Sequence, residues 1–382
     1  MLQKSCLRSG GFRDSQENGQ QWTQTQNSPL ANSEYCAIYS MASSQRQLFT
    51  SKEYGQDLFK FEKVLGVGTL GCVRLATFMK ETLPRDDVQR NLPQVVAIKV
   101  MEKSVILRYK QVDHINNELK ILLSISHPFA IQCFGSFQDE KNLYLILEAV
   151  QGGEFFFYLR EQGQLENVQA KFYAAQVCEI FDYLHSLHII YRDLKPENLL
   201  VGKDGYLKLA DFGFAKVVTL RTYTLCGTPE YIAPEMLLNK GHSKPLDWWT
   251  LGILIYEMLV GRPPFFDDEP IGIYKKIIDG KITFPAHIDK DAKRLIRKLL
   301  EADLGKRWGN LINGVNDIKK CKWMSEINFE DLQKKRITAM YIPSLQCDND
   351  FSNFGAFSED VNPVKSAAVF KNEGAPNPFP DW

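Results

Sequence analysis

The chain has 382 residues, 44% of them hydrophobic, with 46 Lys and Arg residues against 46 Asp and Glu residues. This length predicts two lobes or two domains, and the apolar content suffices for a sizeable core. The balanced charge gives no global argument for binding nucleic acid or an anionic membrane, and no apolar run approaches the ~20 residues of a transmembrane helix, so charge is interpreted locally.

The first 45 residues are rich in Ser, Gln, Asn and Gly and contain few clustered hydrophobic residues. Such a segment cannot bury enough apolar surface to order itself, so we expect residues 1–45 to be mostly disordered. No secretory signal is recognisable, and Leu2 in place of glycine excludes N-myristoylation at this start site. Residues 46–58 are expected to carry a short helix that leads into the first strand.

A glycine-rich turn lies between two segments with strand character, 59–65 and 74–78. Its glycines, spaced as in G-x-G-x-x-G, are Gly66, Gly68 and Gly71. Dinucleotide-binding proteins use the same spacing, but there a helix begins within the glycines. Here strand-forming residues precede and follow them, which favours a strand–turn–strand hairpin whose bare backbone can lie over phosphates.

A single lysine, Lys99, interrupts the apolar run 95–101, which is predicted to be a buried strand after an exposed polar loop over 79–94. A buried ammonium group is unfavourable unless a carboxylate meets it. Apolar residues recur with helical spacing over 109–125, and Glu118 lies beside that face, so we expect it to pair with Lys99. Alternatively, Lys99 lies at the solvated end of the strand and Glu118 is a solvated helix acid.

The next predicted strand, 142–150, is almost wholly apolar, as in a strand inside a fold. It is followed by Gly152 and Gly153, near which we place the boundary between two lobes. Beyond them the chain becomes mainly helical, with buried helices predicted over 170–187 and over 248–259, the second opened by Asp247.

The segment 190–200 places an acid, an amine, a second acid and an amide within six positions, between apolar anchors. These four residues are Asp193, Lys195, Glu197 and Asn198. Such a segment can hold a base, a cation and a metal-binding oxygen over one reacting atom. Asp211 ends a short apolar run before a glycine, so it is expected to supply a second metal ligand. For either segment alone, a polar turn between strands is the alternative.

The last segment, 325–382, contains several prolines and is not expected to form a compact domain. Its aromatic residues are expected to hold it against the surface of the rest: Phe351, Phe354, Phe357, Phe370, Phe379 and Trp382. The eight cysteines of the chain are scattered without a C-x-x-C pair, so we expect them to be reduced in an intracellular protein. We expect it in the cytoplasm, with the nucleus as a further location.

Taken in order, these segments resemble the signature of the protein kinase family. They are the glycine turn with Val73, Val-Ala-Ile-Lys at 96–99, Glu118, Tyr-Arg-Asp at 191–193 with Asn198, Asp-Phe-Gly at 211–213 and Ala-Pro-Glu at 233–235. Within the family, the chain is similar to catalytic subunits of cyclic-AMP-dependent protein kinase, in the AGC group. That closer similarity is carried by 221–231, 247–249, 263–266, 313–318 and the terminal Phe379-x-x-Trp382.

The resemblance implies an α+β fold with two lobes: a small N-lobe made of an antiparallel sheet and one helix, and a larger, mainly helical C-lobe. It places the kinase domain at 59–324, divided into an N-lobe at 59–149 and a C-lobe at 150–324, and a wrapping AGC-type tail at 325–382. The chain departs from the family in its longer loop at 79–94, its missing myristoylation signal, its terminal tryptophan, and Gly-Ala-Phe at 355–357 in place of an acidic stretch.

The resemblance also implies ATP as phosphate donor and Mg²⁺ as the metal. The implied nucleotide-binding positions are Leu65, Gly66, Gly68, Gly71, Val73, Ala97, Lys99, Glu118, Leu147, Glu148, Leu200 and Phe354. Leu147 would gate the adenine pocket, and Asn198 and Asp211 would bind the metal. The implied catalytic residues are Asp193, Lys195, Asn198 and Thr228, with Thr228 bonded to Asp193 and Lys195.

The implied activity is phosphorylation of Ser or Thr preceded by arginines, in the pattern Arg-Arg-x-Ser/Thr. Glu154, Glu197 and Glu257 would receive those arginines, and an apolar pocket for the following residue would be formed by Leu225, Pro229 and Ile232. Thr224 would be the activation-loop phosphosite, and its phosphate would be collected by His114, Arg192 and Lys216. A separate inhibitory, cAMP-binding regulatory subunit would dock at Tyr223 and Tyr274. No nucleic-acid partner is expected.

Three other functions remain open at this point. The first is another AGC kinase, such as a cyclic-GMP-dependent type, although no cyclic-nucleotide-binding region is recognisable. The second is a pseudokinase scaffold, which the filled catalytic positions argue against. The third, a dinucleotide-binding enzyme, does not explain the set Lys99, Asp193 and Asp211.

Overall fold

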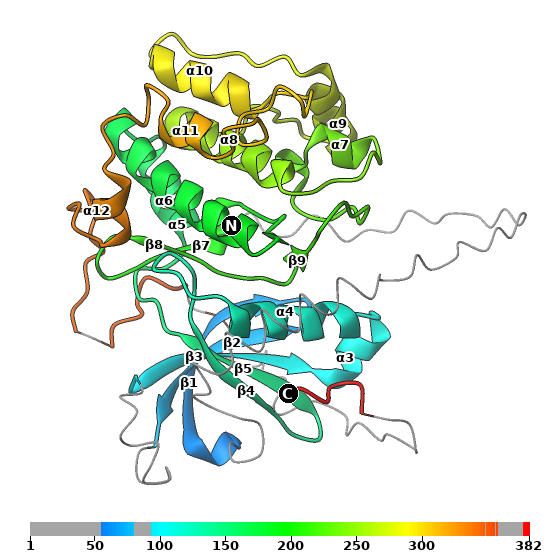
Figure 1. Ribbon diagram of the computed structural model, residues 1–382. Coiled ribbons are helices and arrows are strands. Elements are labelled where there is room, and N and C mark those ends of the chain that lie inside the picture. Colours follow the sequence, from blue (N-terminus) through cyan, green and yellow to red (C-terminus); the bar gives the residue numbers. More distant parts are fainter. Residues whose placement is uncertain (1–54, 80–92, 348, 356, 358–376) are drawn as a thin grey trace, which may run out of the picture.

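The computed structural model describes residues 55–79, 93–347, 349–355, 357 and 377–382. These residues form two lobes, a sheet lobe with a long helix and a helical lobe (Figure 1), which confirms the expected two-lobed α+β fold. The disorder expected over 1–45 and most of the loop expected over 79–94 lie outside the described residues. Of the helix expected over 46–58, the described part is a three-residue 3-10 turn, Gln56–Leu58.

The N-lobe is a five-stranded antiparallel sheet with the strand order β1-β2-β3-β5-β4. Its strands are β1 (Phe59–Gly68), β2 (Gly71–Phe78), β3 (Val95–Glu102), β4 (Cys133–Gln138) and β5 (Asn142–Glu148). The strand–turn–strand hairpin around the glycines is therefore confirmed. Along β3, Val96, Ile98 and Val100 face one apolar cluster and Ala97 faces another, as a strand buried on both sides requires.

The helix predicted over 109–125 is present as α4 (Val112–Ser124), but it begins three residues later than predicted. A second helix, α3 (Lys103–Arg108), precedes it and was not predicted. Lys110 separates the two helices because its backbone is left-handed, with φ at 54°. On α4, Ile115, Leu119 and Leu122 are buried together with Glu118.

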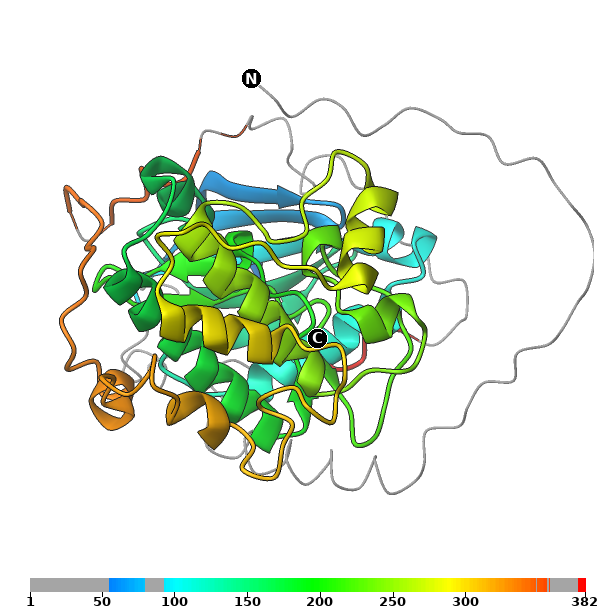
Figure 2. The same ribbon diagram turned by 90° about the horizontal axis from the view of Figure 1, so that it is seen from above.

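The C-lobe is built around two long helices, α6 and α8, with shorter helices around them (Figure 2). Its helices are α5 (Phe155–Gln162), α6 (Asn167–Ser186), α7 (Pro234–Leu237), α8 (Pro245–Val260), α9 (Pro270–Asp279), α10 (Lys290–Leu299) and α11 (Asn316–Lys319). The prediction that Asp247 opens α8 is wrong, because Pro245 occupies the first turn. Asp247 is fully buried inside that turn.

The tail begins with α12 (Phe329–Gln333) and its described parts run along the outside of both lobes (Figure 1). The aromatic anchors expected there are confirmed for Phe351, Phe379 and Trp382, which are buried, and for Phe354, which is half-buried. Phe357 is 41% exposed, so the expectation is wrong for it, and Phe370 lies outside the described residues. Trp382 also donates its indole N–H to Oδ1 of Asn116 on α4, at 2.8 Å.

No described helix combines the length and apolar character needed to cross a lipid bilayer.

Candidate active site

The backbone just before Asp193 is fixed by hydrogen bonds to a buried carboxylate. This stretch follows the short strand β6 (Ile189–Ile190), and Asp247 of α8 accepts hydrogen bonds from the main-chain N–H groups of Tyr191 and Arg192, at 3.0 and 2.9 Å. Nε2 of His185 lies 2.7 Å from the same carboxylate. Arg192 has a left-handed backbone, with φ at 72°, which is a strained conformation for this residue. The Asp247 contacts therefore fix the backbone conformation immediately before Asp193.

Asp193 presents one unpaired oxygen on a buried carboxylate. Its Oδ2 accepts from Nδ2 of Asn198 at 2.8 Å and lies 3.0 Å from Nζ of Lys195. Its Oδ1 is buried and has no hydrogen-bond partner among the described residues. Burial raises the pKa of Asp193, although Lys195 and Asn198 oppose the change. Oδ1 is thus the atom that can accept a hydrogen bond, or a proton, from an incoming hydroxyl group.

The expected pair between Lys99 and Glu118 is present, with Nζ and Oε1 at 2.7 Å. Nζ of Lys99 also lies 3.4 Å from Oδ1 of Asp211. Burial disfavours the charge of Lys99, but the carboxylates of Asp211 and Glu118 outweigh it and raise the pKa of Lys99. Lys99 therefore stays charged. It links the N-lobe sheet and α4 to Asp211, two residues after the end of β8 (Leu207–Leu209).

Asn198 and Asp211 fit the needs of a hard divalent cation. Asn198 makes its hydrogen bonds to Asp193 with the amide nitrogen, so its amide oxygen is the atom left for a cation. The main-chain N–H of Ala210 donates to the carbonyl of Asn198 at 2.8 Å, which brings Asp211 beside it. The Asp211 side chain is 55% exposed, and Lys99 lowers its pKa, so the carboxylate is charged and open.

The described residues contain no cluster of three or more His, Cys, Asp or Glu side chains suited to a metal. An ion held by Asn198 and Asp211 must therefore complete its coordination with water or with oxygens of a bound molecule. Mg²⁺ binds in this way, through one or two protein ligands together with phosphate oxygens.

Five of the expected nucleotide-binding residues share one apolar cluster. They are Leu65, Val73, Ala97, Leu147 and Phe354. Leu200 packs instead against the main core. The Glu148 carboxylate pairs with Lys208 at 2.9 Å, and the main-chain N–H of Glu148 donates to the carbonyl of Gln132 at 2.8 Å.

The turn glycines divide into two kinds. A Cβ on Gly71 would lie 1.8 Å from the carbonyl oxygen of Val100, so packing within the chain requires glycine there. A Cβ on Gly66 would meet nothing within 4 Å. The chain's own packing does not explain Gly66, whereas close approach of a ligand to the backbone would.

The cations expected around Thr224 lie together, and none of them forms a salt bridge with a described residue. Nη1 of Arg192 is buried and has no hydrogen-bond partner among the described residues, while Nε donates to the carbonyl of Phe214 at 2.7 Å. Lys216, in β9 (Lys216–Val217), donates to Oγ1 of Thr222 at 3.2 Å. Burial, followed by the charge of Arg192, lowers the pKa of both His114 and Lys216. Thr224 itself is exposed.

The structure differs from two detailed expectations. The side chain of Thr228 makes no hydrogen bond to Asp193 or Lys195 among the described residues, although the chain passes close by: a Cβ on Gly227 would lie 3.8 Å from Oδ1 of Asp193. Glu257 is buried and already paired, with Nη2 of Arg160 at 2.6 Å and the hydroxyl of Tyr231 at 2.5 Å. Sequence reasoning missed Arg160 and Tyr231 because neither carries a local pattern.

Glu154 and Glu197 remain without an ion-pair partner among the described residues and lie near each other. Burial and then the charge of Glu197 raise the pKa of Glu154, while Lys195 opposes the change. Leu225 is 58% exposed, whereas Ile232 is buried in the main core. An apolar pocket shared by these two residues and Pro229 therefore remains a prediction.

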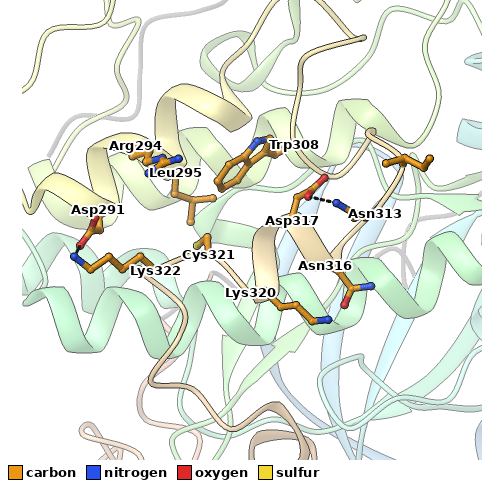
Figure 3. A pocket seen from close by; sticks show the side chains of 11 residues that line it. Asp291, Arg294, Leu295, Trp308, Asn313, Asn316, Asp317, Lys320, Cys321 and Lys322 are labelled. Atoms are coloured by element: carbon orange, nitrogen blue, oxygen red, sulfur yellow. Dashed lines mark hydrogen bonds and ion pairs between the residues drawn. The ribbon is translucent and has the colours of Figure 1, made fainter.

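Two cavities lie away from Asp193, Asn198 and Asp211. One, of about 730 Å³, lies between α10 and α11, where Asp291 pairs with Lys322 and Asn313 with Asp317 (Figure 3). The other, of about 660 Å³, is lined by residues that include Glu148 and Lys208. Neither is lined by Asp193, Asn198 or Asp211, so the convergence of side chains defines the candidate site.

Comparison with known proteins agrees with this geometry. Residues 59–324 match the family model of the protein kinase domain. The chain is 46% identical to cAMP-dependent protein kinase catalytic subunit 3 of Drosophila melanogaster, over 82% of this chain and 52% of that protein. It is 48% identical to the cAMP-dependent protein kinase catalytic subunit of Dictyostelium discoideum, over 79% and 45%.

The human cAMP-dependent protein kinase catalytic subunit PRKX is 45% identical, over 80% of this chain and 86% of that protein. The chain thus spans about half the length of the fly and Dictyostelium relatives and most of the human one. The chain belongs to the protein kinase family and is similar to cAMP-dependent protein kinase catalytic subunits.

Proposed function

We propose that the chain is a serine/threonine protein kinase that transfers the γ-phosphate of ATP to a hydroxyl group, with Mg²⁺ as the metal ion. The observation that carries the proposal is a set of contacts that brings four side chains together: Lys99 meets Asp211, the neighbouring Ala210 bonds to the main chain of Asn198, and Asn198 bonds to Asp193. Phosphoryl transfer asks a protein mainly for alignment and for neutralisation of oxygen charge, and this set supplies both cations and metal-binding oxygens.

In this mechanism Lys99, oriented by Glu118, binds the α- and β-phosphates. Asn198 and Asp211 would hold the metal ion, which would neutralise charge on the phosphate oxygens. Asp193 orients the substrate hydroxyl through Oδ1 and accepts its proton, and Lys195, 3.0 Å from Asp193, stabilises the transferred group. The apolar cluster around Ala97 and Leu147 accommodates the adenine ring.

For substrates we propose the pattern Arg-Arg-x-Ser/Thr. Glu154 and Glu197 support it because they are neighbouring carboxylates without an ion-pair partner among the described residues, and carboxylates bind guanidinium groups in two-point geometry. Glu257 would have to share its carboxylate between a substrate arginine and Arg160.

The proposed partner is an inhibitory, cAMP-binding subunit that contacts Tyr223, which is 61% exposed, and Tyr274. We propose a cytoplasmic location because the described cysteines are free thiols.

The test is phosphate transfer from ATP and Mg²⁺ to the peptides Arg-Arg-x-Ser and Lys-Lys-x-Ser. We expect kcat/KM to be roughly 10-fold or more lower for the lysine peptide, since a charge-assisted hydrogen bond contributes about 1.5–3 kcal/mol. Glu154→Gln should shrink that preference, whereas Glu330→Gln, at an exposed helix position, should leave it unchanged. Absence of transfer to either peptide would refute the kinase assignment, and equal use of both would refute the specificity alone.

Thr224 is expected to be phosphorylated by the chain itself, because Arg221 precedes it by three residues as in a basic-directed substrate. A phosphate there adds roughly −1.5 to −2 charges beside Arg192 and Lys216. Intact-mass measurement and peptide mapping should find it on wild-type protein made in bacteria and not on the Asp193→Asn variant. Full phosphorylation of that variant in bacteria would contradict the prediction.

A further inference from the structure

His242 lies directly opposite the activation loop. Thr222 and His242 exchange both of their main-chain hydrogen bonds, N–H to carbonyl oxygen, at 2.9 and 2.8 Å, and form an antiparallel bridge. Residues paired in this way project their side chains from the same face. The hydroxyl of Thr222 accepts from Lys216, so this shared face is the one that carries the cations described above.

Thr224 follows two residues later along the same non-helical segment, where no residue has a positive φ. Side chains two residues apart in an extended chain return to the same face. Tyr223, between them, lies on the other side, where a Cβ on Gly241 would come within 2.8 Å of its ring. His242, Thr222 and Thr224 are thus expected to face the same cluster.

His242 is 2% exposed, and its Nε2 has no hydrogen-bond partner among the described residues. An unsatisfied buried polar group costs about 1–3 kcal/mol, so Nε2 of His242 calls for a partner that the described residues do not supply. Nη1 of Arg192, in the same cluster, is unsatisfied in the same way. Two unsatisfied nitrogen groups near one phosphorylatable hydroxyl indicate a common oxygen acceptor.

The charges around His242 would stabilise an anion bound there. Arg192 and Lys216 are positive, and the two nearby acids are engaged elsewhere. Glu235 is paired with Arg307, and Asp247 accepts from the catalytic segment. Burial, followed by the charge of Arg192, lowers the pKa of His242 to about 4, so the ring is neutral at pH 7. A phosphate would add negative charge beside the ring and raise the pKa of His242, and a protonated ring can donate from both nitrogens.

We propose that His242 is a further ligand of the phosphate on Thr224, donating from Nε2 to a phosphate oxygen beside Arg192, Lys216 and His114. This rests on the proposed phosphorylation of Thr224. His242 acts as a positioning residue: through the bridge to Thr222 and the bond to the phosphate, it ties the loop to the segment between α7 and α8 at two points instead of one.

The first test titrates the wild-type protein, so it does not depend on how a variant folds. Protein with phosphothreonine incorporated at position 224 during translation is compared, by NMR of ¹⁵N-labelled histidine rings, with the same protein after a phosphatase has removed the phosphate. We expect the pKa of His242 to rise from about 4 by two units or more on phosphorylation. An unchanged pKa would overturn the proposal. His127, whose pKa burial also lowers to about 4, lies in the α4–β4 connection and should not respond.

The second test measures removal of the Thr224 phosphate by a phosphatase. The His242→Gln protein should lose it several-fold faster than wild type, and His127→Gln at the wild-type rate; equal rates for His242→Gln and wild type would refute the role of His242. Peptide phosphorylation is assayed on the same samples. A protein that shows the pKa shift but transfers no phosphate would refute the proposed function and leave the His242 inference standing.

Discussion

The Asp193→Asn variant is expected to phosphorylate peptide with a kcat roughly 10²–10⁴-fold below wild type, the range typical of losing a general base. Asparagine has the same shape and can still meet Lys195 and Asn198, but its amide cannot take up the hydroxyl proton at the position of Oδ1. KM for ATP should change little, because Lys99 and Asp211 are untouched. Steady-state kinetics with peptide and ATP varied separately measure both quantities.

The matched control is Asp303→Asn, which replaces an exposed carboxylate beside Lys306 and should leave kcat unchanged.

The pH dependence of kcat gives an independent check. Only ionised Asp193 can accept a proton, so kcat falls as the pH drops through its pKa, and burial moves that pKa up. Lys195 opposes the shift, so Lys195→Met should move the acid limb to higher pH as well as lower kcat. A variant Asp193→Asn with near wild-type kcat would remove Asp193 from the chemistry.

The strands of the N-lobe were predictable because their patterns are local. The run 95–101 is apolar with one cation, and 142–150 is almost wholly apolar, so β3 and β5 follow from composition alone. The break between α3 and α4 was not predictable, because it depends on Lys110 adopting a left-handed conformation that lysine rarely takes. β4 contains Gly135 at an irregular register, which weakens the strand pattern in the sequence.

Within the site, motif spacing identified the residues but not their partners. The pair Lys99–Glu118 was predictable because a buried lysine needs an anion and a helix nearby offered one. The contact from Asp247 to Tyr191 spans 56 residues, and no local pattern encodes it. The same holds for Glu257, whose sequence position suggested a free carboxylate, although Arg160 and Tyr231 already occupy it. Long-range pairs of this kind become visible only once the chain has been folded.

The largest stability loss is expected from removing Arg307. Its side chain is fully buried and makes two parallel hydrogen bonds to Glu235, at 2.7 and 2.9 Å, with further bonds to the carbonyls of Pro245 and Glu301. Arg307→Ala leaves the Glu235 carboxylate buried without a cation, which costs about 3–5 kcal/mol in comparable pairs. Urea unfolding should show this loss as a lower midpoint at constant slope.

The neighbouring Lys306 provides the control, because it is 70% exposed and pairs with Asp303. Lys306→Ala should change the free energy of unfolding by at most about 1 kcal/mol, as exposed ion pairs do. The double variant Glu235→Gln with Arg307→Met should recover part of the loss, since it removes the unpaired buried charge together with its partner. Equal losses of unfolding free energy for Lys306→Ala and Arg307→Ala would show that the buried pair contributes no more to stability than an exposed pair.

Removal of Arg307 should also affect activity. Arg307 binds the carbonyl of Pro245, two residues before Asp247, and Asp247 in turn fixes the backbone before Asp193. Arg307→Ala should therefore lower kcat even where the protein is still folded.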